Sequence, residues 1–163
     1  MRVWHQLAVV NQFWSGKFPS RLPTALNFAA KHESFMSDEV FLRHHQDGDV
    51  LVLSPEGDFM KVREIQMRAE YNELYRILSM ADCKHMVVDF ADIEYFGSTF
   101  IGILIRLAQR VKKNEGTSVL CCLNERMKDV LKGLMLLENV KVDFFAGCTD
   151  TREEALTKVR GAG

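Results

Sequence analysis

The stretch 87–105 restricts the possible folds more than any other part of the chain. Val87–Phe90 is short, apolar and rich in β-branched residues, which is typical of a buried central strand. After a short loop, Phe100–Val111 is almost entirely apolar, and this predicts a helix packed into a core. Ser98 stands where the N-cap residue of that helix is expected, because its hydroxyl can accept a hydrogen bond from the first free backbone N–H groups. The stretch therefore predicts a strand, a loop and a helix at the centre of the fold.

Ser98 has two interpretations at such a position. A helix N-terminus carries a partial positive charge and unpaired N–H donors, so it favours a phosphate group. The residue is therefore either a plain helix cap or a phosphorylation site. A role as the nucleophile of a small hydrolase has no local support, because Gly97-Ser98-Thr99 lacks the second glycine of a nucleophile elbow. Since the chain also has no standard Gly-rich phosphate loop, we do not expect an enzyme.

Strand and helix patterns alternate along the rest of the chain. Asp47-Gly48 predicts a hairpin turn between two apolar runs. The alternation that follows implies crossover connections, so we predict an α/β fold with a mostly parallel central sheet of about five strands, an opening antiparallel hairpin and about four helices. The strands are expected at 40–46, 50–53, 87–90, 118–123 and 140–145, and the helices at 62–80, at 100–111, after Asn124, and after Asp150 or Thr151.

The chain has 163 residues, the length of one domain with an appendage. Residues 38–160 are expected to form the domain, and 161–163 a short tail. Residues 1–37 form an N-terminal extension, which is either helical, on the spacing of its apolar residues, or partly disordered. Alternatively, Met36 is the true start of the protein and the preceding segment is a gene-prediction artefact.

Composition and charge exclude several classes of partner. A formal net charge of −1 gives no electrostatic basis for binding nucleic acid, and no apolar run reaches transmembrane length, so no membrane partner is expected either. We expect a cytoplasmic protein whose four cysteines are reduced thiols. None of the cysteines has CxxC spacing, and neighbours such as Cys121 and Cys122 within a strand would point to opposite faces. We therefore expect no metal and no cofactor.

Several carboxylates follow predicted strands. Asp58 lies in the loop after the second strand, and Asp92 and Glu94 lie in the loop after the central one. Because the carboxyl ends of parallel strands meet at one edge of a sheet, these side chains could share that edge with Ser98. Asp89, within the central strand, would be buried and so needs partners, for which N–H groups of the following loop are candidates.

From about residue 38 to residue 160, the chain resembles the STAS domain family, the module of anti-sigma factor antagonists and of sulfate-transporter tails. The resemblance rests on the loop Ser54–Asp58, on Val88-Asp89-Phe90 and above all on Tyr95–Leu104. In this last segment the family usually has an aspartate, a serine, a serine or threonine, and then Gly-Leu-Gly before an apolar helix.

The residue that is phosphorylated in the family falls on Ser98, with Thr99 as its neighbour, and Gly102 matches the second glycine. Two positions depart from the usual form. Gly97 replaces the aspartate before the serine, and Phe100 replaces the first glycine, where its bulk is expected to alter the partner surface.

The resemblance implies a bacterial, cytoplasmic regulator of transcription that is not an enzyme. Unphosphorylated, it would sequester an anti-sigma factor serine kinase, which is the partner that binds ATP; phosphorylation of Ser98 would break the complex, and a phosphatase would be a further partner. Taken together with the sheet-edge argument, the residues expected at the partner-binding edge are Asp58, Asp92, Glu94, Gly97, Phe100 and Gly102, with Asp89 as structural support. The alternative is a STAS protein without the switch, which acts as a scaffold or as the soluble partner of a lipid or anion transporter.

Overall fold

The chain divides into two units, residues 1–39 and 40–163. The computed structural model describes residues 40–58, 64–137 and 143–161, all of which belong to the second unit. The predicted N-terminal extension, with the helix expected in it and the alternative start at Met36, lies outside the described residues. The fold below is that of the second unit.

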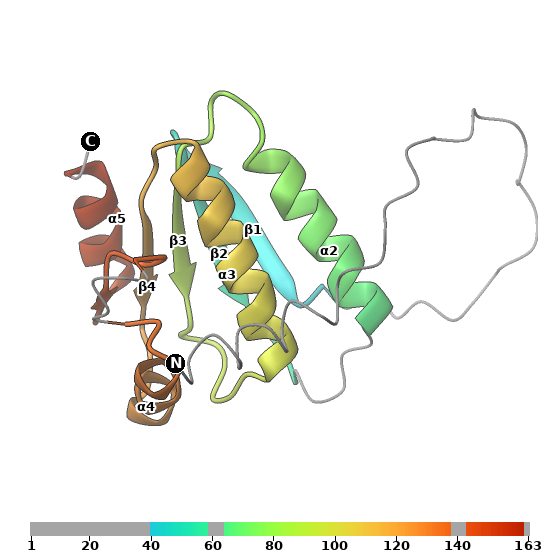
Figure 1. The fold of residues 1–163 in the computed structure, drawn as a ribbon, viewed down its shortest axis with the longest axis vertical. Helices are drawn as coiled ribbons and strands as arrows, with labels where there is room; N and C mark the ends of the chain where they lie inside the picture. Colours follow the sequence, from blue (N-terminus) through green and yellow to red (C-terminus); the bar gives the residue numbers. More distant parts are fainter. Residues whose placement is uncertain (1–39, 59–63, 138–142, 162–163) are drawn as a thin grey trace, which may run out of the picture. The chain divides into compact units, whose positions relative to one another are not determined.

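Strands and helices alternate as the sequence predicts (Figure 1). The elements are β1 (Leu42–Asp47), β2 (Val50–Pro55), α2 (Glu64–Ile77), β3 (His85–Asp89), α3 (Ser98–Lys113), β4 (Ser118–Cys121), α4 (Glu125–Gly133), β5 (Cys148–Thr149) and α5 (Arg152–Arg160). The five-stranded sheet has the order β1-β2-β3-β4-β5, with β1 antiparallel to β2 and every other pair parallel. The predicted α/β fold with a mostly parallel sheet and an opening antiparallel hairpin is confirmed.

Both faces of the sheet centre are covered. Every residue of β2, β3 and β4 is buried, which is the pattern of parallel strands that have helices on both sides. Helices α2 and α3 pack against each other, and Figure 1 shows them side by side in front of the strands. On the other face, Ala155 and Val159 of α5 pack on a row of valines from the central strands. The strand ends and loops at one edge are therefore the places where polar side chains can gather.

The opening hairpin differs by one residue from the prediction. The turn residues are Gly48 and Asp49, because Asp47 is still paired with Val50 at the end of the ladder. Gly48 has a φ of 64°, which a glycine adopts at no steric cost. The resulting two-residue loop suits the twist of the strands that it joins.

Two of the predicted helix caps are confirmed. The side chain of Asn124 accepts a hydrogen bond of 2.9 Å from the backbone N–H of Met127 at the start of α4. At the start of α5, the hydroxyl of Thr151 accepts one of 3.2 Å from the N–H of Glu154. Each cap satisfies an N–H group that has no acceptor within its own helix.

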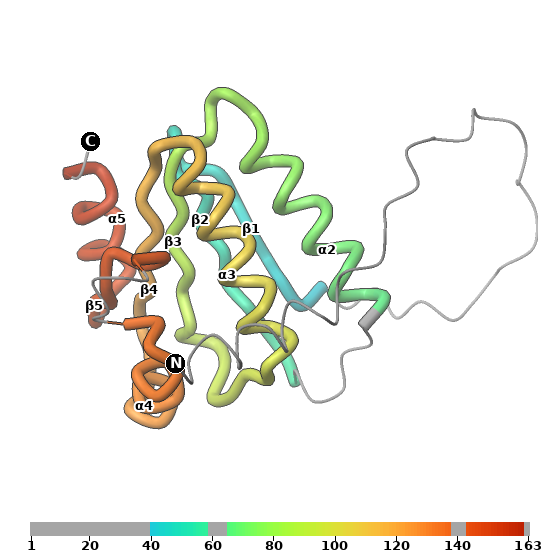
Figure 2. The backbone as a smooth tube through the Cα atoms, viewed as in Figure 1, coloured from blue at the N-terminus to red at the C-terminus, as the bar shows by residue number. Residues whose placement is uncertain are grey.

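The last strand is where the sequence prediction is wrong. Residues 140–142 of the predicted strand 140–145 lie outside the described residues, and Phe145 lies in a loop, with β5 only at Cys148–Thr149 (Figure 2). Phe145 is nevertheless buried. The loop also bonds to β4 before β5 begins, since Ala146 N–H donates to Ser118 O and Leu120 N–H donates to Gly147 O. A buried apolar side chain in a loop can thus give the sequence the same alternating apolar pattern as a strand.

Candidate functional site

The loop between β3 and α3 is fixed by buried apolar side chains at regular intervals. Phe90, Ile93, Phe96 and Phe100 are between 1% and 7% exposed. Between these buried positions, the residues at 91, 92, 94, 95, 98 and 99 are exposed. These four buried side chains anchor the loop and the start of α3, together called the mount, so that the exposed residues, most of them polar, face outward at the carboxyl edge of the sheet.

Phe100 belongs to the mount and not to the surface. Its ring centroid lies 6.2 Å from that of Phe90 and 6.1 Å from that of Phe96, and the latter two are 5.5 Å apart. Such tilted and edge-on aromatic contacts add to the stability gained from burial. The expectation that Phe100 alters the partner surface by its bulk is wrong, because a residue that is 1% exposed presents no side chain to a partner.

Ser98 is the first residue of α3 and not its N-cap. The N-cap is Gly97, with extended backbone angles (φ −94°, ψ 172°), and no side chain caps this helix. Ser98 and Thr99 are both exposed. The first turn of α3 contains no acidic residue, so nothing in it offsets the partial positive charge of the helix N-terminus. An exposed hydroxyl thus stands at a helix start whose backbone N–H groups lack intrahelical acceptors.

Replacing Gly97 by aspartate is expected to stabilise the protein by about 0.5 to 1 kcal/mol, because it would supply the side-chain cap that α3 lacks and place a negative charge at the helix N-terminus. A Cβ atom at this position meets no heavy atom within 4 Å, and its backbone angles suit an N-cap residue. Urea unfolding monitored by circular dichroism measures the change. Gly97→Ala is the control, since it adds the Cβ without the acceptor and should not stabilise; equal stability of the two variants would contradict the capping argument.

The other residues predicted at the partner-binding edge differ in their exposure to solvent. Asp58, Asp92 and Glu94 are exposed in the loops that follow the parallel strands β2 and β3. The carbonyl oxygen of Glu94 accepts a hydrogen bond of 3.1 Å from the side chain of Asn124, which ties this loop to the start of α4. Gly102 is buried inside α3 and offers no surface to a partner.

Asp89 is buried at the end of β3 and is fully engaged, as its position predicts. Its carboxylate accepts hydrogen bonds from the N–H of Ala91, at 3.1 Å, and from Arg152 Nε, at 2.6 Å. Burial acts to raise the pKa of this carboxyl, but the hydrogen bonds from Cys122, Arg152 and Ala91 outweigh burial and leave the pKa below its usual value. The charged aspartate therefore fastens the start of the β3–α3 loop to α5.

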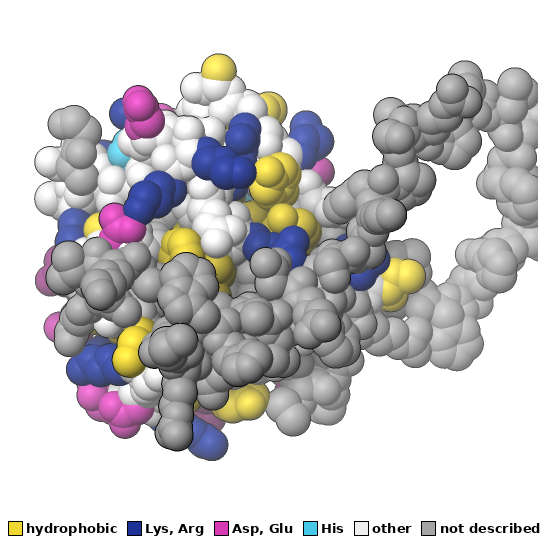
Figure 3. Space-filling view, viewed as in Figure 1, with side chains coloured by type: hydrophobic (Ala, Val, Ile, Leu, Met, Phe, Trp, Pro, Cys, Tyr) yellow, Lys and Arg dark blue, Asp and Glu magenta, His cyan; other side chains and the backbone are white. Residues whose placement is uncertain are grey.

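An open groove of about 570 Å³ lies beside the loop, on the side of β4 and α4. Its lining includes Tyr95, Asn124 and Arg126. The guanidinium of Arg126 stands 5.7 Å from the ring centroid of Tyr95, at the distance of a cation–π contact. In the sequence, only its place two residues after the predicted helix cap at Asn124 marks Arg126, and this does not predict a role in a groove. On the face seen in Figure 3, basic, acidic and hydrophobic side chains are interspersed.

The mixed five-stranded sheet with helices on both faces defines a compact α/β module. Beyond the central strand of this module, an exposed serine stands at the start of a helix. The family model of the STAS domain matches residues 42–155, and the chain therefore belongs to the STAS domain family. A search of curated proteins gave no match. None of the helices in the described part has the length and hydropathy needed to cross a membrane.

Solved structures of anti-sigma factor antagonists share the fold. A STAS domain protein of this kind from Planctomyces limnophilus is 24% identical, with a TM-score of 0.58 over 73% of this chain and 97% of the other. The anti-sigma factor antagonist SpoIIAA in its unphosphorylated form is 14% identical, with a TM-score of 0.60 over 74% of this chain and 96% of the other. A structure of the stressosome, described as a signal integration and transduction hub, includes a chain that is 18% identical, with a TM-score of 0.54 over 73% and 96%.

Proposed function

We propose that this protein is an anti-sigma factor antagonist whose domain spans residues 38–160 and whose binding to a serine kinase is controlled by phosphorylation of Ser98. It acts in the cytoplasm as a binding module and not as an enzyme. The partner kinase is itself the anti-sigma factor and binds the ATP, and a phosphatase restores the unphosphorylated form. The family membership and the antagonists among the similar structures support this role.

The exposed hydroxyl of Ser98 at the first residue of α3 is the observation that carries the proposal. A phosphate group adds about −1.5 to −2 charges at neutral pH, and the N-terminus of a helix is a favourable place for that charge. Within the protein the modification is thus tolerated without refolding. Against an acidic or apolar partner surface, the same charge costs desolvation and repulsion. SpoIIAA has also been solved in a phosphorylated form, which supports a phosphorylated state of this fold.

The test is to incubate the full-length protein with its cognate kinase and ATP, and to map the phosphorylated peptide by mass spectrometry. We expect one phosphate on Ser98 and none on Thr99, and no incorporation in Ser98→Ala. The gene for a serine kinase of the anti-sigma type next to the gene for this protein would identify the enzyme to use. Phosphate recovered only on residues other than these two would refute the proposed switch.

Gly97 supports one alternative, a STAS protein without the switch that acts as a scaffold or as the soluble partner of a lipid or anion transporter. The usual aspartate before the serine is missing, and the N-cap of α3 has no side chain to orient an incoming kinase. The similarity to a chain of the stressosome also suits a scaffold. In that case the protein would bind its partners equally well before and after incubation with the kinase and ATP.

A further inference from the structure

Two adjacent cysteines and the buried aspartate come together at the end of β4. A regular strand places neighbouring side chains on opposite faces, and on that ground Cys121 and Cys122 were not expected to share a metal. The structure shows that the two residues depart from this strand geometry. Strand β4 ends at Cys121, and Cys122 takes a left-handed conformation with a φ of 59°. The turn brings both sulfur atoms and a carboxylate oxygen of Asp89 within 4.8 Å of one another.

We propose that Asp89, Cys121 and Cys122 form a binding site for one Zn²⁺ ion or a similar thiophilic divalent cation. Thiolates and a carboxylate are a donor set that zinc accepts. A tetrahedral zinc ion with bonds of about 2.0 to 2.3 Å holds its ligand atoms about 3.5 to 3.8 Å apart. The three groups thus need only small side-chain rotations to close on the ion. On binding, each thiol releases its proton to the solvent and ligates as a thiolate.

The surroundings of the three groups suit a bound cation. Two thiolates, one carboxylate and a divalent cation sum to one negative charge, and the guanidinium of Arg152, 2.5 Å from Asp89, offsets it. A carboxylate has about four lone-pair sites, so Asp89 can keep its bonds to Arg152 and to Ala91 N–H while one lone pair ligates the ion. Arg152 and Ala91 then act as outer-shell groups that orient the ligand.

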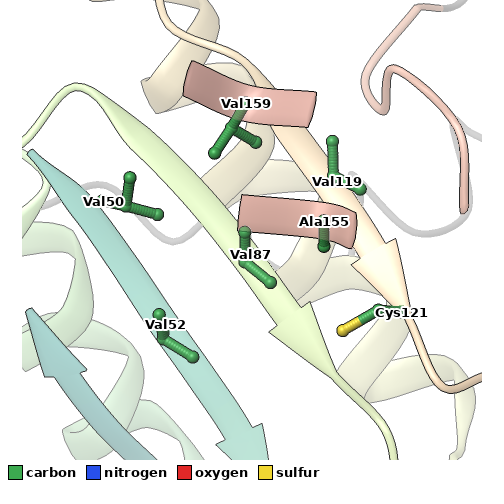
Figure 4. Packing of buried hydrophobic residues seen from close by; sticks show 7 residues of the cluster. All are labelled: Val50, Val52, Val87, Val119, Cys121, Ala155 and Val159. Carbon is green, nitrogen blue, oxygen red and sulfur yellow. The ribbon is translucent and has the colours of Figure 1, made fainter. Parts of the chain in front are cut away.

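The site has an open side and a closed side. Cys121 is fully buried, and Figure 4 shows it next to the valines beneath α5, with its sulfur turned toward β3. Cys122 is half-buried and lines the groove beside Tyr95 and Arg126. A cation can therefore enter from the groove, and the fourth coordination position would face it. Three protein ligands with one open position is the arrangement of zinc sites that bind a further small ligand.

The first experiment titrates the reduced, untagged full-length protein with Co²⁺ under nitrogen. We expect a near-ultraviolet thiolate-to-cobalt charge-transfer band that saturates at one equivalent and is abolished by one equivalent of Zn²⁺. The band should be lost in Cys122→Ser and retained in the matched control Cys148→Ser, since Cys148 is also a half-buried free thiol but lies outside the cluster. No band in the wild-type protein, or an unchanged band in Cys122→Ser, would overturn the proposal.

A second measurement needs no variant. One equivalent of Zn²⁺ should slow alkylation of Cys122 by iodoacetamide at least ~10-fold, read by mass spectrometry of peptides, while Cys148 in the same sample reacts at its original rate. Ligation removes the thiolate that alkylation requires, whereas adventitious zinc on the surface does not. Equal rates for Cys122 with and without zinc would also refute the site. Neither readout depends on phosphorylation, so the outcome is independent of the proposed function.

Discussion

Ser98→Asp is expected to weaken binding to the partner kinase at least ~100-fold, a loss of about 2.7 kcal/mol or more. The substitution places a fixed negative charge on an exposed residue of the first turn of α3, where the protein itself accommodates it. A partner surface that fits the neutral hydroxyl must then desolvate and repel that charge. Isothermal titration calorimetry of the purified kinase with each variant measures the change.

Two controls isolate the effect of the charge at this position. Ser98→Ala should bind within ~3-fold of the wild-type protein, because it removes the hydroxyl without adding charge. Thr157→Asp adds the same charge at an exposed position of α5, on the opposite face of the sheet, and should also leave binding unchanged. Equal affinities for Ser98→Asp and Ser98→Ala would exclude the switch, even if the kinase phosphorylates Ser98.

Much of the mount for Ser98 could be predicted because it depends on local patterns. The strand before it and the apolar helix after it both follow from hydrophobic periodicity, which extends over whole elements and so survives small errors at the ends. The cap at Asn124 is likewise a local hydrogen bond between residues that are neighbours in sequence.

What the sequence did not reveal depends on contacts between distant segments or on single backbone angles. The partnership of Asp89 with Arg152 joins residues that are 63 positions apart. The convergence of Cys121 and Cys122 depends on one left-handed residue at a strand end, which no hydrophobic pattern marks. Phe100 was assigned to the surface because the family has a glycine there, but its ring in the first turn of α3 packs on the rings of Phe90 and Phe96 instead.

Gly116 lies just beyond the end of α3, which ends at Lys113 and has Asn114 as its C-cap residue. A glycine so close to a helix end usually supplies the left-handed residue that stops the helix. The left-handed residue, however, is Glu115, with a φ of 58°, whose N–H donates to Lys112 O, while the N–H of Gly116 donates to Val111 O. These two bonds are those of a Schellman motif with Glu115 at its left-handed position. The backbone conformation at position 116 therefore does not itself require a glycine.

Gly116→Ala is expected to destabilise the protein by more than ~3 kcal/mol, because the backbone of another segment occupies the space that a side chain would need. A Cβ at this position would lie 1.7 Å from the carbonyl oxygen of Lys84 and 2.8 Å from its carbonyl carbon. Lys84 cannot give way easily, since its own N–H and that of His85 both donate to Asp49 O at the start of β3. Relief of the clash would pull β3 away from the hairpin, so the cost falls on the central strand. Chemical denaturation should show a lower midpoint, and thermal unfolding a fall of about 10 °C or more.

Gly133→Ala is the matched control, and the two substitutions should have opposite signs. Gly133 is the last residue of α4, and a Cβ there meets no heavy atom within 4 Å. Alanine should therefore stabilise the protein by about 0.5 to 1 kcal/mol, as it does at an unobstructed helical position. Glu115→Gly should also stabilise by about 1 kcal/mol, since glycine adopts the left-handed conformation without strain. If Gly116→Ala instead unfolds within 1 kcal/mol of the wild-type protein, the close approach of the helix end to β3 does not exist in solution. The mount that holds Ser98 at the sheet edge would then need a different account, because α3 and β3 would not be fixed to each other at this end.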